Sequence, residues 1–221
     1  MNKVRLCTAA LIVVLCAGLA MSAGQMQLTS DKLRYDPDKG MIYASGNVRV
    51  TGRGAVATSS EGEASADGAM SHLWGDVNAE WADGSKTLAC DDLVTREADR
   101  GQKVFAKNVS RFEDVTQNLV MKAREMEGLL VDGEFSELTA MGNVVADTVA
   151  ADGKATRVTG DRAVYSKARG TLVFTGNALA VQKDRRITAD HFVMHVESGK
   201  IEALGNPRMV VDMPPQEKEA Q

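Results

Sequence analysis

The chain has 221 residues, of which 26 are Lys or Arg and 30 are Asp or Glu, so its formal charge is −4. Nucleic-acid binding needs a basic surface, so we expect no nucleic-acid partner. Hydrophobic residues make up 44% and charged residues 25%, which is typical of a folded domain rather than a disordered chain. The 20 Gly and 4 Pro are too few for collagen. We therefore expect the glycines at tight turns and irregular backbone positions.

Residues 1–23 have the pattern of a secretory signal peptide. Lys3 and Arg5 precede the uncharged, largely apolar run 6–21, and small residues up to Ala23 offer a cleavage site. The run is shorter than the roughly 20 residues of a membrane span; retention as a membrane anchor is the alternative. Cleavage would leave Cys90 as the single cysteine. For Cys90 we predict a buried, apolar role in a strand rather than a nucleophilic one.

A Gly-Asn-apolar motif recurs through the remaining chain. Its copies begin at residues 46, 75, 107, 142, 176 and 205, in steps of 29, 32, 35, 34 and 29 residues, with looser matches at 75 and 107. In three copies an aspartate stands 15 residues before the glycine, namely Asp31, Asp161 and Asp190. Recurrence at nearly fixed spacing indicates a repeat architecture of about six units.

Within each unit, apolar residues recur at every second position. Leu33 and Tyr35 alternate with Lys32 and Arg34, as expected for strands with one buried face. Segments 36–40, 166–170 and 197–200 have the composition of turns between strands. Each unit is predicted to supply about two strands, and the Gly-Asn pair fits a corner or bulge because both residues tolerate positive φ.

The fold class that follows is all-β, built from about six two-strand units. A single unit cannot bury its apolar face, so stacked units would form a pair of sheets with an apolar interior. Residues 120–130 have a helix-like composition but are interpreted as a strand in this context. The predicted boundaries are a signal peptide at 1–23, one β-domain at 24–212 and a disordered tail at 213–221.

The export pattern together with the repeat resembles the OstA/LptA family of lipopolysaccharide (LPS) transport proteins. The clearest matches are residues 31–50, 161–181 and 190–211, and the resemblance covers about residues 28–211. The motif is shared by LptA, by the membrane-anchored LptC and by the N-terminal domain of LptD. The resemblance implies an open, slightly twisted β-jellyroll in the periplasm that holds the acyl chains of LPS, or of a similar glycolipid, in its interior.

The resemblance also implies the partners of the chain. Protomers of the family join end to end by strand pairing and bridge the inner and outer membranes. Transport components of both membranes, and further copies of this chain in a head-to-tail homo-oligomer, are therefore expected partners. If the N-terminal segment is retained, an inner-membrane-anchored, LptC-like component is the alternative.

Apolar side chains on the inward-facing positions are the predicted acyl-chain contacts. Each buried methylene contributes about 0.8 kcal/mol, so one chain of about 12 methylenes gains on the order of 10 kcal/mol before ordering costs. The 11 Met suit an adaptable interior, because thioethers fill irregular space. The alternative is that these side chains merely pack on one another. The predicted contacts are Leu33, Tyr35, Ile42, Val48, Val50, Phe174, Phe192 and Met194.

We expect that the protein is not an enzyme and that it has no cofactor and no metal site. His191 and His195 share a strand face, but the pattern supplies no third ligand. Asp91 and Asp92 are adjacent in a predicted strand and would face opposite sides. Two rival functions stay open: a structural β-repeat filament without lipid cargo, and a β-helix enzyme acting on polysaccharide, which would need carboxylates clustered in a cleft.

Overall fold

The computed structural model describes residues 26–81, 84–149 and 153–212. The predicted signal peptide and the predicted disordered tail lie outside these described residues. In the described ranges, no helix has the length and apolar character needed to cross a membrane.

In the described residues, fourteen strands form one antiparallel sheet, which confirms the predicted all-β class. From β3 to β13, neighbours in sequence are neighbours in the sheet, while β1 and β2 both pair with β3, and β14 pairs with β12. Residues 120–130 lie within β8, so their interpretation as a strand is confirmed. The strands are β1 Gln27–Thr29, β2 Lys32–Asp36, β3 Met41–Gly52, β4 Ala55–Ser65, β5 Met70–Trp81, β6 Lys86–Glu97, β7 Gln102–Asp114, β8 Leu119–Val131, β9 Glu134–Val149, β10 Ala155–Ser166, β11 Thr171–Gln182, β12 Arg185–His195, β13 Lys200–Leu204 and β14 Arg208–Val211; the short 3-10 turns η2 Val115–Gln117 and η3 Lys167–Arg169 lie in connections.

The long strands bend at the repeated motif. In β3, Gly46 (φ +73°) and Asn47 (φ +49°) both adopt the left-handed conformation, and the pairing with β4 shifts register between Ser45 and Val48. The same conformation recurs at residues 75–76, 142–143, 176–177 and 205–206. The prediction that this motif forms a corner or bulge is therefore confirmed.

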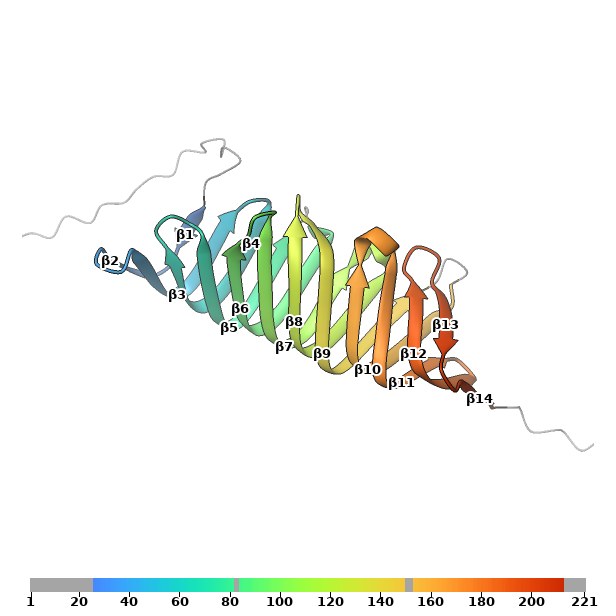
Figure 1. The fold of residues 1–221 in the computed structure, drawn as a ribbon. Helices are drawn as coiled ribbons and strands as arrows, with labels where there is room; N and C mark the ends of the chain where they lie inside the picture. Colours follow the sequence, from blue (N-terminus) through green and yellow to red (C-terminus); the bar gives the residue numbers. More distant parts are fainter. Residues whose placement is uncertain (1–25, 82–83, 150–152, 213–221) are drawn as a thin grey trace, which may run out of the picture.

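The bends fold the sheet into two layers, seen one in front of the other in Figure 1. We call layer A the strand halves on the side of β2 and β13, and layer B the halves on the side of β1 and β14. In β3, residues 41–45 belong to layer A and residues 48–52 to layer B. The result is an open jellyroll, as the resemblance implied.

The hairpin connections at the free ends of the layers form two facing rims. Rim A holds the connections β4–β5, β6–β7, β8–β9, β10–β11 and β12–β13, and rim B holds β3–β4, β5–β6, β7–β8, β9–β10 and β11–β12. The space between the rims is called the mouth of the jellyroll below.

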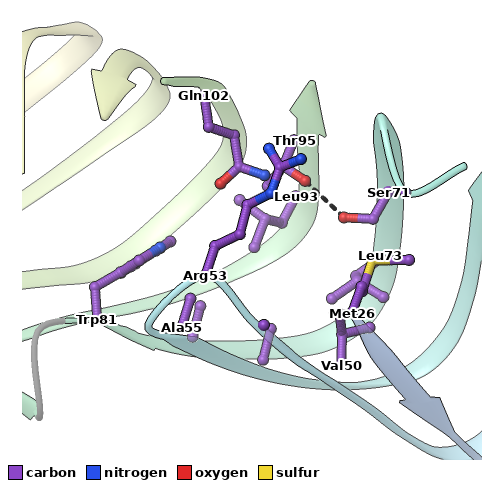
Figure 2. Close-up of a pocket in the computed structure, with 14 residues that line it drawn as sticks. Met26, Val50, Arg53, Ala55, Ser71, Leu73, Trp81, Leu93, Thr95 and Gln102 are labelled. Atoms are coloured by element: carbon purple, nitrogen blue, oxygen red, sulfur yellow. Dashed lines mark hydrogen bonds between the residues drawn. The ribbon is translucent and has the colours of Figure 1, made fainter. Parts of the chain in front are cut away.

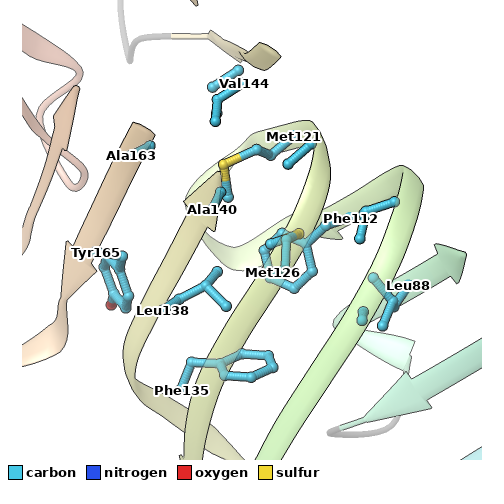
Figure 3. Close-up of a cluster of buried hydrophobic side chains, with 14 of the residues drawn as sticks. Leu88, Phe112, Met121, Met126, Phe135, Leu138, Ala140, Val144, Ala163 and Tyr165 are labelled. Carbon is cyan, nitrogen blue, oxygen red and sulfur yellow. The ribbon is translucent and has the colours of Figure 1, made fainter. Parts of the chain in front are cut away.

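Apolar side chains from both layers fill the centre of the interior (Figure 3). Phe174 and Phe192 are fully buried, and Met121 and Val144 belong to the same continuous core. This core is packed, because its largest side chains have no solvent contact.

Candidate functional site

A cavity opens between the layers near the N-terminal end of the sheet (Figure 2). It encloses about 590 Å³, part of it open to solvent. Leu73 and Leu93 line it from layer A, and the small Ala55, Ala57 and Ala79 line it from layer B. Three alanines in adjacent strands leave room that larger side chains would fill. We call this space the N-terminal chamber.

Three polar side chains of the N-terminal chamber, Ser71, Thr95 and Arg53, have partners. The hydroxyls of Ser71 and Thr95 are hydrogen-bonded at 2.6 Å (Figure 2). At the mouth, an Arg53 guanidinium nitrogen lies 3.3 Å from a Glu97 carboxylate oxygen. Arg53 belongs to rim B and Glu97 to rim A, so this ion pair crosses the mouth. The walls therefore suit an apolar ligand, while the opening carries paired charges.

Aromatic rings close the inner end of the N-terminal chamber. Trp81 lines the chamber and meets Phe135 edge-on, with ring centroids 6.0 Å apart. Phe135 in turn meets Phe112 edge-on at 5.7 Å. An added Cβ on Gly128 would lie 2.7 Å from the Phe135 ring, so the ring occupies space that only glycine leaves free. We call Trp81, Phe135 and Phe112 the aromatic wall.

A buried lysine lies next to the aromatic wall. Lys86 is 1% exposed, and its Nζ donates to Oε1 of Glu134 at 2.8 Å and lies 3.8 Å from Oδ2 of Asp114. Glu134 begins β9 at rim A, whereas Lys86 and Asp114 stand at rim B. The Lys86–Glu134 contact therefore also crosses the mouth, and it is far better shielded from water than the Arg53–Glu97 pair.

A second opening lies at the C-terminal end. This C-terminal groove encloses about 1070 Å³, part of it open to solvent, and has an apolar floor that includes Ile187 and Ile201. Lys154, Arg185 and Lys200 line its edge. The Lys200 Nζ is engaged by a Glu202 carboxylate oxygen at 2.9 Å. The groove thus combines apolar surface with a basic margin.

The structure places the predicted acyl-chain contacts in four settings. Val50 is half-buried and lines the N-terminal chamber. Ile42 is half-buried in layer A. Leu33 and Tyr35 lie on β2 at the sheet end, more than half exposed. The remaining four are fully buried in the core, namely Val48, Phe174, Phe192 and Met194.

Exposed apolar residues gather at both ends of the sheet. The N-terminal end presents Leu33 and Tyr35 on β2. The C-terminal end presents Leu204 on β13 and three residues of β14, namely Met209, Val210 and Val211. Sheet edges with exposed apolar side chains are competent to pair with another strand.

Several residues considered for catalysis or metal binding make other contacts. Cys90 is buried, as predicted, and burial raises the pKa of its thiol to about 12. Asp91 accepts a hydrogen bond from Asn108, whereas Asp92 contacts His72 on the opposite face of β6. In the described ranges, no group of three or more His, Cys, Asp or Glu is arranged to hold a metal ion.

Fold and site together define a class of protein: a bent antiparallel sheet with an apolar interior that opens at its ends, suited to holding an apolar ligand between two layers. The family described as "LptA/(LptD N-terminal domain) LPS transport protein" matches residues 58–200. The chain therefore belongs to this family of LPS transport proteins, as its repeat predicted.

Among solved structures, the crystal structure of LptH from Pseudomonas aeruginosa is similar to this chain. It is described as the LptA-homologous periplasmic component of the conserved LPS transport device. The sequence identity is 12% and the TM-score 0.31, and the similarity covers 87% of this chain and 96% of that chain. No curated protein matches the chain.

Proposed function

We propose that the chain is a periplasmic carrier that binds LPS by its acyl chains, between layers A and B. The observation that supports this function best is the N-terminal chamber, whose wall of leucines and alanines lies between the two layers in a member of an LPS transport family. The proposal needs no catalytic group and no cofactor, because the carrier only transfers its ligand.

The energetics favour binding of LPS through its acyl chains over binding through its head group. Each methylene moved from water into the chamber contributes about 0.8 kcal/mol. The chain is acidic overall, with a formal charge of −4, so long-range attraction to anionic phosphates is weak. At the mouth, Arg53 is already paired with Glu97. The apolar walls therefore supply most of the affinity.

The predicted contacts take different parts in this proposal. Val50 touches a chain in the N-terminal chamber directly. Leu33 and Tyr35 contact ligand or a partner at the end of the sheet. Side chains in the packed core, such as Phe174 and Phe192, meet a chain only if the two layers move apart.

End-to-end pairing is the second part of the proposal. The exposed apolar residues of β2 at one end and of β14 at the other support strand addition between copies. Because the two ends differ, such pairing is head-to-tail and produces an open row. Such a row, joined to transport components of the two membranes, would bridge them.

The rival functions differ in what they require of the interior. A structural filament needs only a filled core, and the packed centre around Phe174 suits it; the N-terminal chamber favours the carrier. An inner-membrane-anchored variant depends on residues 1–23, which lie outside the described residues. Mass spectrometry of the N-terminus of the exported protein distinguishes the cleaved carrier from the anchored variant. A start near Gly24 would exclude the anchored variant.

Photocrosslinking in cells tests the carrier function. A photoreactive amino acid at Val50 or Ala57 faces the N-terminal chamber, whereas one at Arg49 faces solvent from the same strand as Val50. We expect LPS to be labelled from Val50 and Ala57 but not from Arg49. Labelling confined to Arg49, or none at any position, would contradict the proposal.

A further inference from the structure

The interior of the jellyroll is divided rather than continuous. The N-terminal chamber ends at Trp81, whose ring meets Phe135, and Phe135 meets Phe112. Beyond the aromatic wall lies a smaller space, lined by Leu119, Leu138 and Tyr165 among others, whose empty volume of about 290 Å³ includes space open to solvent. A chain lying in the N-terminal chamber therefore stops at the aromatic wall in this conformation.

The central residue of the wall stands directly beside the buried ion pair. Glu134 and Phe135 are consecutive at the start of β9. Alternation in the strand turns the Phe135 ring into the interior, while the Glu134 carboxylate reaches Lys86 across the mouth at 2.8 Å. The ion pair and the ring are thus held by the same end of one hairpin.

That hairpin has a point at which it can bend. The pairing of β8 with β9 shifts register between Leu129 and Leu130, just inside the turn at residues 132–133. A bulge leaves the ladder locally irregular and allows the strand to pivot there. Residues 130–135, from the bulge to the wall, therefore form a unit whose movement keeps the rest of the β8–β9 pairing and gives up the pairing of Leu130 with Gln102 of β7.

We propose that residues 130–135 are an internal gate, with Phe135 as the barrier and the Lys86–Glu134 ion pair as its latch. This inference rests on the proposed function, because it describes how far an acyl chain reaches into the interior. Closed, the gate limits the chain to the N-terminal chamber. When the latch opens, the hairpin carries Phe135 away and a longer chain can extend toward the core.

The Arg53–Glu97 pair supplies an internal control for the latch. It also crosses the mouth, but its side chains are 41% and 56% exposed, and no wall residue adjoins Glu97 in the chain. An exposed pair of this kind contributes little to stability. Removing Glu97 should therefore leave the depth of the chamber unchanged, whereas removing Glu134 should increase it.

The test measures binding of alkylphosphocholines of increasing chain length, each kept below its micellar concentration. Trp81 lines the chamber, so its fluorescence reports occupancy once Trp74 is replaced by Phe. In the otherwise unaltered chain, affinity should rise about fourfold per methylene and then level off where the chain meets Phe135. Phe135→Ala and Glu134→Ala should move this levelling point to longer chains. Glu97→Ala should not.

Phe135→Leu is a second test in case the alanine variant misfolds, because leucine keeps the site apolar. It should move the levelling point in the same direction by a smaller amount. Levelling at the same length in the unaltered chain and in both Phe135 variants would overturn the gate while leaving the carrier function intact. A continued rise with no levelling in the unaltered chain would do the same. Absence of any binding in the unaltered chain would overturn the carrier function and the gate together.

Discussion

The Asp161 carboxylate accepts a hydrogen bond from the side-chain amide of Asn177 at 2.9 Å, across the bend between β10 and β11. The same contact joins Asp31 to Asn47 at 2.9 Å. It recurs between Asp190 and Asn206 at 3.1 Å, and between Asp91 and Asn108 at 3.0 Å. The Asp and the Asn that recur in the repeat are therefore hydrogen-bond partners, and each pair holds one corner of the jellyroll together.

Replacing Asp161 by Ala should weaken the corner without unfolding the protein. A hydrogen bond to a charged group contributes about 1.5–3 kcal/mol when shielded, and since Asp161 is exposed we expect a loss of about 1 kcal/mol. The loss of stability is measured from the urea concentration at the midpoint of unfolding. The matched control is Asp38→Ala in the exposed β2–β3 turn, which should change stability by less than about 0.5 kcal/mol. Equal losses of stability from the two substitutions would contradict a stabilising role of the Asp161–Asn177 hydrogen bond at the corner.

Gly176→Ala should cost more than Gly170→Ala. Both glycines have positive φ, +74° and +60°. An added Cβ on Gly176 would lie 2.5 Å from the Asp161 carboxylate, while one on Gly170 would meet nothing within 4 Å. We expect about 1 kcal/mol at Gly170 from the backbone alone, and about 2–3 kcal/mol at Gly176. Urea unfolding of the two variants compares their stabilities directly. Equal losses of stability would show that the Asp161 carboxylate moves aside for the added Cβ at little cost.

The corners could be predicted from the sequence because their signal is local. Gly and Asn are the residues that tolerate positive φ, and alternation on either side identifies the strands. The sequence pattern also shows the Asp at its fixed offset as part of the repeat, but alternation does not predict its contact with the Asn. A constant 15-residue spacing to the adjacent Gly was the available signal.

The chamber, the aromatic wall and the latch could not be predicted in the same way. Alternation marks Ala57 and Phe135 alike as inward-facing, and only their packing against the other layer decides which leaves a space and which fills one. Lys86 lies in phase with Leu88 and Cys90, which predicts burial, but lysine is seldom buried without a partner. Its partner Glu134 lies 48 residues away, beyond any local pattern.

Cys90 should make the stability of the protein fall at alkaline pH. The thiol pKa is raised from 9.0 to about 12 by burial, so the unfolded chain releases this proton at lower pH than the folded chain. The stability that the Cys90 thiol contributes is therefore fully present below pH 9.0 and is lost between pH 9.0 and about 12. Urea midpoints at pH 8 and pH 10 should differ more in the parent chain than in Cys90→Ala, with Cys7 and Cys16 replaced by serine in both. Identical pH dependence in the two proteins would exclude the effect.

Charged residues at the ends of the sheet should stop its self-association. Leu33→Lys on β2 and Val210→Lys on β14 place a charge on an exposed apolar edge, which disfavours the addition of another strand. Sedimentation at increasing concentration should show assembly of the parent chain and of Ser110→Lys, a control that adds the same charge on β7 in the middle of the sheet. Each end variant alone should stay monomeric.

Mixing the two end variants decides whether the pairing is head-to-tail. Leu33→Lys retains an intact β14 end and Val210→Lys an intact β2 end, so a mixture should form dimers that cannot grow longer. This follows because a head-to-tail contact joins two different surfaces and needs only one intact copy of each. A contact between identical ends would instead let one of the variants dimerise by itself and would gain nothing from mixing. That outcome, or a parent chain that stays monomeric at every concentration, would contradict the end-to-end part of the proposed function.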